Sequence, residues 1–259
     1  NEQGPTSLLA KLLWIKKHQP EIFSKTNCLL PGASDYVVFR MTGEKATDTT
    51  TASTTGLMEL VERKWIDDAL FNKMGLQGVQ TLLPKLFDGG AKIGELQKKA
   101  ATDLGIPAGL PVFLGPGDAG SATIGAGCGV PGKAYAYIGT SGWVAFAEKQ
   151  PADPTTGVIT LSHPKCDHFI QVAPLLTAGG NLEWAKSLSN FESYDSLIND
   201  AISSPLSNLI FLPYLKGERS PFIDPKARGA FIGLQSTTGQ SAMNRAVLEG
   251  ICFAFRHAL

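Results

Sequence analysis

LPVFLGPGDAGSATIGAG, residues 110–127, is the stretch from which the fold class can be predicted. Its apolar start, from Leu110 to Gly115, predicts a buried strand, and the small residues after Gly117 predict a helix that approaches a neighbour closely. Asp118 lies in the glycine-rich turn between the two. Open α/β sheets bind ligands beyond the ends of their strands, at turns of this kind. The carboxylate is therefore either a functional group or a cap of the following helix, and the spacing favours neither.

A second glycine turn, GTSG at residues 139–142, joins two stretches that predict strands. These strands are expected over 133–138 and 143–147. Gly139 leaves backbone N–H groups accessible, and the hydroxyl groups of Thr140 and Ser141 add donors, so the turn is suited to phosphate oxygens. A plain hairpin turn is the alternative. The sequence holds no GxxxxGK[ST] motif, which excludes a Walker A loop.

A third glycine site is TAGGNLEW, residues 177–184, where Gly179 and Gly180 begin a predicted helix. Two glycines at a helix start allow a flat ligand such as a purine to lie against the backbone. They also allow close packing of the helix on a neighbouring segment, and the sequence leaves both explanations open.

The rest of the chain alternates between predicted helices and short strands. Helices are expected over 6–18, 65–74, 82–86, 93–104 and from Gly239 onward, and strands over 168–174 and 210–213. Asp48 is the only acid in a threonine- and serine-rich run at 47–55, which predicts a solvated loop. An ion-pair network is expected to fix the charged loop at 216–230. This pattern predicts an α/β protein with a mixed sheet and helices on its faces.

Composition excludes several classes of protein. The 259 residues are 43% hydrophobic, and 23 basic residues balance 23 acidic ones, which argues against nucleic acid or an anionic membrane as the partner. Cys28, Cys128, Cys166 and Cys252 are far apart, so free thiols in a reducing cytoplasm are expected. No apolar run is long enough to cross a bilayer. The chain opens on Asn1 without a methionine, and we interpret it as an internal fragment.

Taken in order, these segments resemble the FGGY family of carbohydrate kinases. The resemblance rests on LLWIKKHQPEIF (12–23), DYVVFRMTGEKATDTTTAS (35–53), GIPAGLPVFLGPGDAGSATIGAG (105–127), YIGTSGWV (137–144), LLTAGGNLEW (175–184), FLPYLKGERSPFIDPKARGAFIGL (211–234) and AVLEGICFAF (246–255). It implies an α/β fold of the actin-like ATPase (ribonuclease H-like) type, with two domains around a cleft, both incomplete here. Residues 1–125 then form the C-terminal part of the sugar-binding domain, and residues 126–259 the N-terminal part of the nucleotide-binding domain.

The resemblance also implies an activity, ATP-dependent phosphorylation of a sugar hydroxyl. A pentulose such as D-xylulose is the expected substrate. The alternatives are gluconate, another polyol or sugar acid, or a non-catalytic nucleotide-binding protein of the actin-like superfamily. ATP and Mg²⁺ are the implied cofactors, with Mg²⁺ held by phosphate oxygens instead of a protein ligand cluster. The family often forms homodimers, and neither nucleic acid nor membrane is an expected partner.

Individual residues receive roles by the same resemblance. Asp118 matches the catalytic base, which also contacts the sugar. Asp48 matches an acid that is structural or near the sugar. The matching phosphate and nucleotide residues are Gly139, Thr140, Ser141, Gly179, Gly180 and Glu183. Ala119 departs from the Asn or Gln common at that position in xylulose and glycerol kinases. Because a phosphate loop and an adenosine-binding segment of the family are missing, the chain alone is expected to be inactive.

Overall fold

The computed structural model describes residues 7–165 and 167–259, and the chain forms two compact units. Unit 1 comprises the described residues up to Pro131, together with Ala147–Gln150 and Leu161–Ile170. Unit 2 comprises Gly132–Phe146, Pro151–Thr160 and Gln171–Leu259. Cys28, Cys128 and Cys252 are free thiols, as expected, whereas Cys166 lies outside the described residues.

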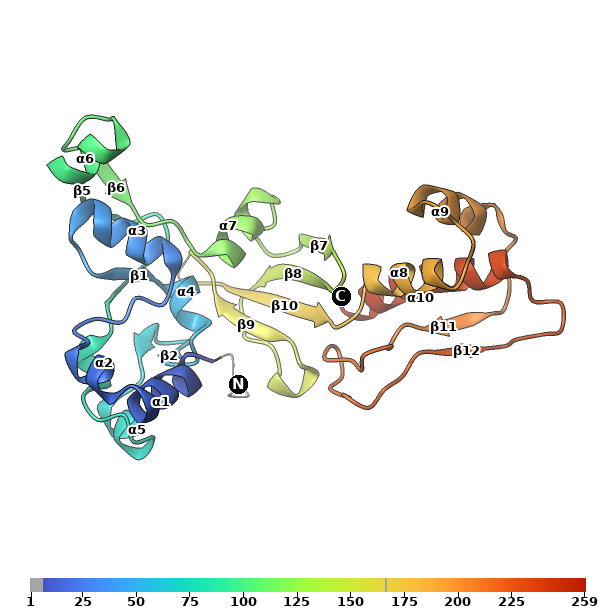
Figure 1. Ribbon diagram of the computed structural model, residues 1–259, viewed down its shortest axis with the longest axis horizontal. Coiled ribbons are helices and arrows are strands. Elements are labelled where there is room, and N and C mark those ends of the chain that lie inside the picture. The colour runs from blue at the N-terminus through green and yellow to red at the C-terminus, as the bar shows by residue number, and fades with distance from the viewer. Residues whose placement is uncertain (1–6, 166) are drawn as a thin grey trace. The chain divides into compact units, whose positions relative to one another are not determined.

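Unit 1 consists of short helices and two-stranded pairings (Figure 1). Its elements are α1 (Leu8–His18), α2 (Pro20–Lys25), α3 (Ala33–Thr42), β1 (Ala46–Asp48), α4 (Thr49–Ser53), β2 (Met58–Glu59), β3 (Lys64–Trp65), α5 (Asp68–Lys73), η1 (Val79–Leu82), β4 (Lys85–Phe87), β5 (Lys92–Glu95), α6 (Lys98–Leu104), β6 (Pro111–Phe113) and α7 (Asp118–Gly125). Strands β1 and β4 pair in parallel, whereas β2 pairs with β3 and β5 with β6 in antiparallel fashion.

Two apolar clusters hold unit 1 together. One gathers Leu12, Leu57, Phe71, Leu76 and Val79, and the other gathers Val38, Ala46, Leu96, Ala101, Val112 and Leu114. The second cluster contains residues from β1 and from the stretch around β6. It therefore fixes β1, which ends at Asp48, and β6, which precedes Asp118.

The remaining elements include a four-stranded sheet of order β7-β8-β10-β9. They are β7 (Ala134–Ile138), β8 (Gly142–Glu148), η2 (Pro154–Thr156), β9 (Ile159–Ser162), β10 (Phe169–Leu175), α8 (Gly179–Ser187), α9 (Tyr194–Ser203), β11 (Ile210–Leu212), β12 (Ala230–Ile232) and α10 (Gln240–His257). Strands β7 and β8 are antiparallel and joined by the GTSG turn, as predicted. Strands β11 and β12 form a separate antiparallel pair.

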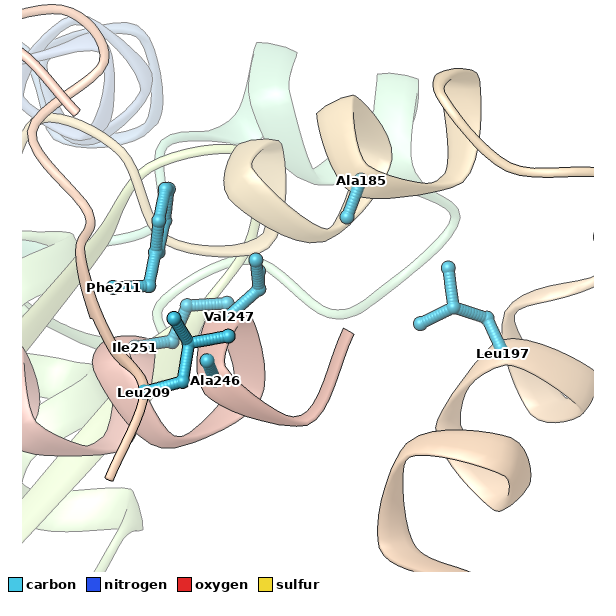
Figure 2. Close-up of a cluster of buried hydrophobic side chains, with 7 residues drawn as sticks. All are labelled: Ala185, Leu197, Leu209, Phe211, Ala246, Val247 and Ile251. Carbon is cyan, nitrogen blue, oxygen red and sulfur yellow. The ribbon is translucent and has the colours of Figure 1, made fainter. Parts of the chain in front are cut away.

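Helix α10 organises the core of unit 2. Figure 2 shows Ala246, Val247 and Ile251 of this helix in one buried cluster with Ala185, Leu197, Leu209 and Phe211. Gly250 allows the helix to approach β11, since a Cβ atom there would lie 2.4 Å from the Phe211 carbonyl oxygen. Trp184 packs against this cluster with its ring 5.6 Å from that of Phe211, so it belongs to the core.

The predicted solvated loop at 47–55 is wrong. This segment forms the end of β1 and all of α4, and Thr47, Thr49 and Thr50 are buried. The hydroxyl-rich composition suggested exposure, but α4 packs against α7, and this tertiary contact turns the side chains inward. Hydroxyl side chains compete for backbone hydrogen bonds in a buried turn as well as in a solvated one.

The prediction for residues 58–104 is also partly wrong. Residues 82–86 form the end of η1 and the start of β4 instead of a helix, and 93–104 begins as β5 before α6. Strands of two to four residues are too short to show a period of two, so sequence periodicity does not separate them from helical turns. The expected buried strand at 110–115 is only half-buried, since Val112 is buried but Phe113 is 57% exposed.

None of the helices in the described part of the chain is both long enough and apolar enough to cross a bilayer.

Candidate functional site

Asp118 is the first residue of α7 and is exposed to solvent. Its Oδ1 atom accepts a hydrogen bond of 2.8 Å from the Ala119 N–H group. The carboxylate therefore takes one of the first N–H groups of the helix, although Gly117 holds the N-cap position. Within the part of the chain that the structure describes, Oδ2 has no hydrogen bond, so an acceptor oxygen of Asp118 is available to a ligand.

Asp48 lies beneath this turn and has no exposed surface. Its Oδ1 atom accepts from the Thr51 N–H group at 2.9 Å, and its Oδ2 atom accepts from the Thr51 hydroxyl at 2.5 Å and from the Gly117 N–H group at 3.2 Å. A direct contact between Asp48 and a sugar does not fit this burial, because protein donors occupy both oxygens. Of the two expectations for this residue, the geometry favours the structural one.

Asp35 is a second buried acid in unit 1 that the sequence did not single out. It follows the start of α3 and accepts a hydrogen bond of 2.8 Å from the Gly32 N–H group. Burial raises the pKa of Asp35, the Gly32 N–H group opposes this, and the charge of Asp48 raises the pKa further. The pattern GASD before a helix is the signal that marks it, since an acid at the third helical position often bonds back to the cap.

In unit 2, the two glycine motifs meet. The Gly139 carbonyl accepts from the Gly179 N–H group at 2.8 Å, and the Thr140 carbonyl accepts from the N–H groups of Ala178 and Gly180, both at 2.9 Å. A Cβ atom on Gly179 would lie 2.6 Å from the Gly139 carbonyl oxygen, and one on Gly180 would lie 3.0 Å from that of Thr140. Close packing therefore accounts for both glycines at the start of α8.

The hydroxyl donors of the GTSG turn remain accessible, whereas the Gly139 N–H group, expected to be accessible, donates to the Ser141 carbonyl at 2.8 Å. Thr140 and Ser141 are exposed, and the hydroxyl group of neither forms a hydrogen bond within the described residues. The carbonyls of Gly139 and Thr140 anchor α8, whereas the side chains of Thr140 and Ser141 face solvent, which suits them to phosphate oxygens. Glu183 lies one turn into α8 and is exposed.

Glu218 fixes the segment that leads into α8. It is 2% exposed, and its Oε1 atom accepts from the Leu176 N–H group at 3.0 Å and the Arg219 N–H group at 2.8 Å. Burial raises the pKa of Glu218, and the backbone N–H groups oppose this. The ion-pair network expected at 216–230 is wrong, because none of the ion pairs among the described residues falls in this loop. The carboxylates of Glu218 and Asp224 hold it instead by accepting hydrogen bonds from backbone N–H groups of the loop.

The two units thus carry different chemistry. Unit 1 presents a carboxylate that can accept a proton, and unit 2 presents hydroxyl donors that can bind an anion. The described residues contain no group of three or more histidines, cysteines or acids that could hold a metal ion.

Comparisons with known proteins match two consecutive parts of the chain to two domains of one family. The N-terminal domain of the FGGY family of carbohydrate kinases matches residues 3–125, and the C-terminal domain of the same family matches residues 134–259. The curated xylulose kinase of Bacillus subtilis is 34% identical over 256 residues, which cover 97% of this chain and 50% of that protein. The chain thus spans about half the length of the curated relatives it matches.

Two solved structures from Lactobacillus acidophilus are similar to the chain to almost the same degree. A ligand-bound xylulose kinase matches with a TM-score of 0.85 and 33% identity, over 98% of this chain and 52% of that one. A gluconate kinase matches with a TM-score of 0.85 and 32% identity, over the same shares. The chain has the α/β fold of these kinases over about half of their length.

Gly179→Ala should destabilise unit 2. The new methyl group would meet the Gly139 carbonyl oxygen at 2.6 Å, so either the turn or α8 must shift. We expect the free energy of unfolding to fall by roughly 1–3 kcal/mol, as measured by urea denaturation. Gly125→Ala is the control, since nothing lies within 4 Å of a Cβ atom there. Equal unfolding midpoints for Gly179→Ala and the wild type would refute the packing explanation.

Glu218→Gln should change how stability depends on pH. The pKa of Glu218 is raised in the folded chain. The protonated side chain therefore makes its whole contribution to the free energy of unfolding below the ordinary glutamate pKa of about 4.3, and this contribution is lost as pH rises through the raised value. The glutamine Oε1 atom can keep both N–H bonds without the buried charge. The melting temperature of the variant, relative to that of the wild type at the same pH, should therefore increase as pH rises.

Thermal unfolding of both proteins across a pH series tests this expectation. Glu192→Gln is the matched control, because Glu192 is an exposed glutamate in the same unit. If the melting temperature of Glu218→Gln relative to the wild type instead fell with rising pH, the pKa of Glu218 would not be raised in the folded chain.

Proposed function

The chain belongs to the FGGY family of carbohydrate kinases, and from this premise we propose that it carries the catalytic base and the phosphate-binding turn of an ATP-dependent sugar kinase. The observation that supports the proposal most directly is the exposed carboxylate of Asp118. It lies at the start of α7, directly after Gly117, whose N–H group donates a hydrogen bond to Asp48. Phosphoryl transfer needs such a group within reach of the attacking hydroxyl.

In the proposed reaction, the oxygen of the sugar hydroxyl attacks the γ-phosphorus of ATP. Asp118 accepts the proton that this hydroxyl group loses. The bond from that phosphorus to the β,γ-bridging oxygen breaks, and ADP leaves. The free Oδ2 atom of Asp118 is the acceptor for the proton. General bases of this kind contribute about 10²–10⁴-fold to the rate.

Unit 2 supplies the proposed contacts to the nucleotide. The hydroxyl groups of Thr140 and Ser141 donate to phosphate oxygens, and Gly139 shapes the turn that presents them. Gly179, Gly180 and Glu183 line the start of α8, where the family holds the nucleotide. Bound Mg²⁺ neutralises charge on the phosphates, as in other phosphoryl-transfer enzymes.

The proposed sugar is a pentulose such as D-xylulose. The xylulose kinase name of the Bacillus subtilis relative supports it. Gluconate is the second candidate, because a gluconate kinase resembles the chain almost as closely as a xylulose kinase does. Overall similarity of this size does not separate the two substrates. A panel of ketoses, polyols and sugar acids, assayed with ATP and Mg²⁺ in the full-length kinase, would identify the acceptor.

We also propose that residues 1–125 belong to the sugar-binding domain and 126–259 to the nucleotide-binding domain, each in part. The coverage of about half of each relative supports this proposal. A complete kinase then needs further sequence to close both sites.

Asp118→Asn in the full-length kinase should lower kcat by about 10²–10⁴-fold, because the amide accepts no proton. Nucleotide binding, measured by calorimetry, should remain close to that of the wild type. Asp103→Asn is the control, since Asp103 is an exposed aspartate on α6. Wild-type turnover in Asp118→Asn would exclude Asp118 as the base. Nucleotide binding without sugar phosphorylation in the unmutated full-length protein would instead favour a non-catalytic nucleotide-binding role.

The 259-residue chain by itself should show no ATP-dependent sugar phosphorylation. Its described residues provide a base and a phosphate turn, while about half of each relative has no counterpart in it. A coupled assay for ADP release, with the sugar panel, measures this directly. Sustained turnover by the isolated chain would show that the missing half is dispensable for catalysis.

A further inference from the structure

From a fully buried position at the N-cap of α4, the Asp48 side chain accepts a hydrogen bond from the turn before Asp118. Its two oxygens accept three hydrogen bonds, two from Thr51 and one from Gly117. Gly117 is the residue directly before Asp118. A single carboxylate thus connects segments that are 69 positions apart in the sequence.

These donors are the hydrogen-bond partners of the buried Asp48 carboxylate. Among the described residues, no lysine, arginine or histidine forms an ion pair with it. A buried carboxylate without a cationic partner is stable only if its oxygens are hydrogen-bonded. Loss of one donor therefore weakens the whole link, and the turn before α7 is held only while the donors stay in place.

The fit between α4 and the turn is close. A Cβ atom on Gly117 would lie 2.5 Å from the Thr51 hydroxyl oxygen, and one on Gly120 would lie 3.3 Å from that of Thr50. Asp118 lies between these two glycines, so the first turn of α7 rests directly on Thr50 and Thr51. Movement of this support would move the carboxylate of Asp118 with it.

We propose that Asp48 and Thr51 are positioning residues that set the place of the Asp118 carboxylate without touching the substrate. This inference rests on the proposed role of Asp118 as the base. In Asp48→Asn, one carboxylate oxygen becomes an amide nitrogen, which cannot accept from Gly117 or from the Thr51 N–H group. A displacement of about 1 Å at a reacting group can cost about 100-fold in rate.

The test compares kcat and KM of variants in the full-length kinase. Asp48→Asn should lower kcat by about 10–100-fold and leave KM for sugar and ATP within about twofold, because binding groups stay in place. Thr51→Val, which removes the hydroxyl donor at nearly constant shape, should act in the same direction. Thr51→Ser keeps the donor and should restore most of the kcat.

A matched control separates positioning from stability. Asp67 caps α5 in unit 1 by accepting from the Leu70 N–H group at 2.9 Å, as Asp48 caps α4. Asp67→Ala, which removes this cap, should lower the melting temperature and leave kcat unchanged. A role of Asp48 in stability alone predicts the same behaviour for Asp48→Asn and Thr51→Val, and that result would overturn the inference. If Asp48→Asn fails to fold, the comparison of kcat between Thr51→Val and Thr51→Ser tests the positioning role.

Asp118→Asn, measured in the same assay, distinguishes a failure of the positioning role of Asp48 and Thr51 from a failure of the role of Asp118 as the base. An inactive Asp118→Asn with fully active Asp48→Asn and Thr51→Val would leave the proposed function intact and refute the positioning role. An active Asp118→Asn would refute both. Equal loss of kcat in Thr51→Ser and Thr51→Val would also count against the inference, since the hydroxyl would then not matter.

Discussion

A buried carboxylate that accepts backbone N–H groups is the interaction on which the arrangement of unit 1 depends. Asp48 has no exposed surface, and its oxygens hold Thr51 and Gly117 at 2.5–3.2 Å. Bonds to a charged acceptor are shorter and stronger than neutral ones, and a buried charge is costly if they are lost. The arrangement therefore has little freedom to relax. It fixes where β1 ends, where α4 begins and where α7 starts.

Unit 2 uses the same principle with different groups. Glu218 holds the Leu176 N–H group, and the carbonyls of Gly139 and Thr140 hold the first N–H groups of α8. The first N–H groups of a helix need partners from outside the helix. Here the partners come from the hairpin turn, so hydrogen bonds join α8 directly to the GTSG turn. Burial raises the pKa of Glu218, and the backbone N–H groups that it accepts oppose this effect.

The sequence was most informative where elements are long or where turns have a strict composition. Helix α10 and the β7–β8 hairpin were predicted because the first repeats apolar residues over 18 positions and the second has a glycine turn between alternating strands. The run at 47–55 was misjudged because its burial comes from packing on α7, a contact far away in sequence. The roles of Gly117 and Thr51 could not be predicted for the same reason. The glycine turn marks Asp118 in the sequence and the family resemblance marks Asp48, whereas the link between them through Gly117 is seen only in the fold.

The close contacts of the glycines determine which residues are left to bind ligands. Gly117 and Gly120 are required by the support beneath α7, and Gly179 and Gly180 by the carbonyls of the GTSG turn. These glycines therefore have a sufficient explanation inside each unit, without any ligand. The groups that remain exposed beside them are the carboxylate of Asp118 and the hydroxyls of Thr140 and Ser141. Ligand binding and proton transfer must come from these three side chains. The glycines allow the close backbone packing that holds the three side chains in place.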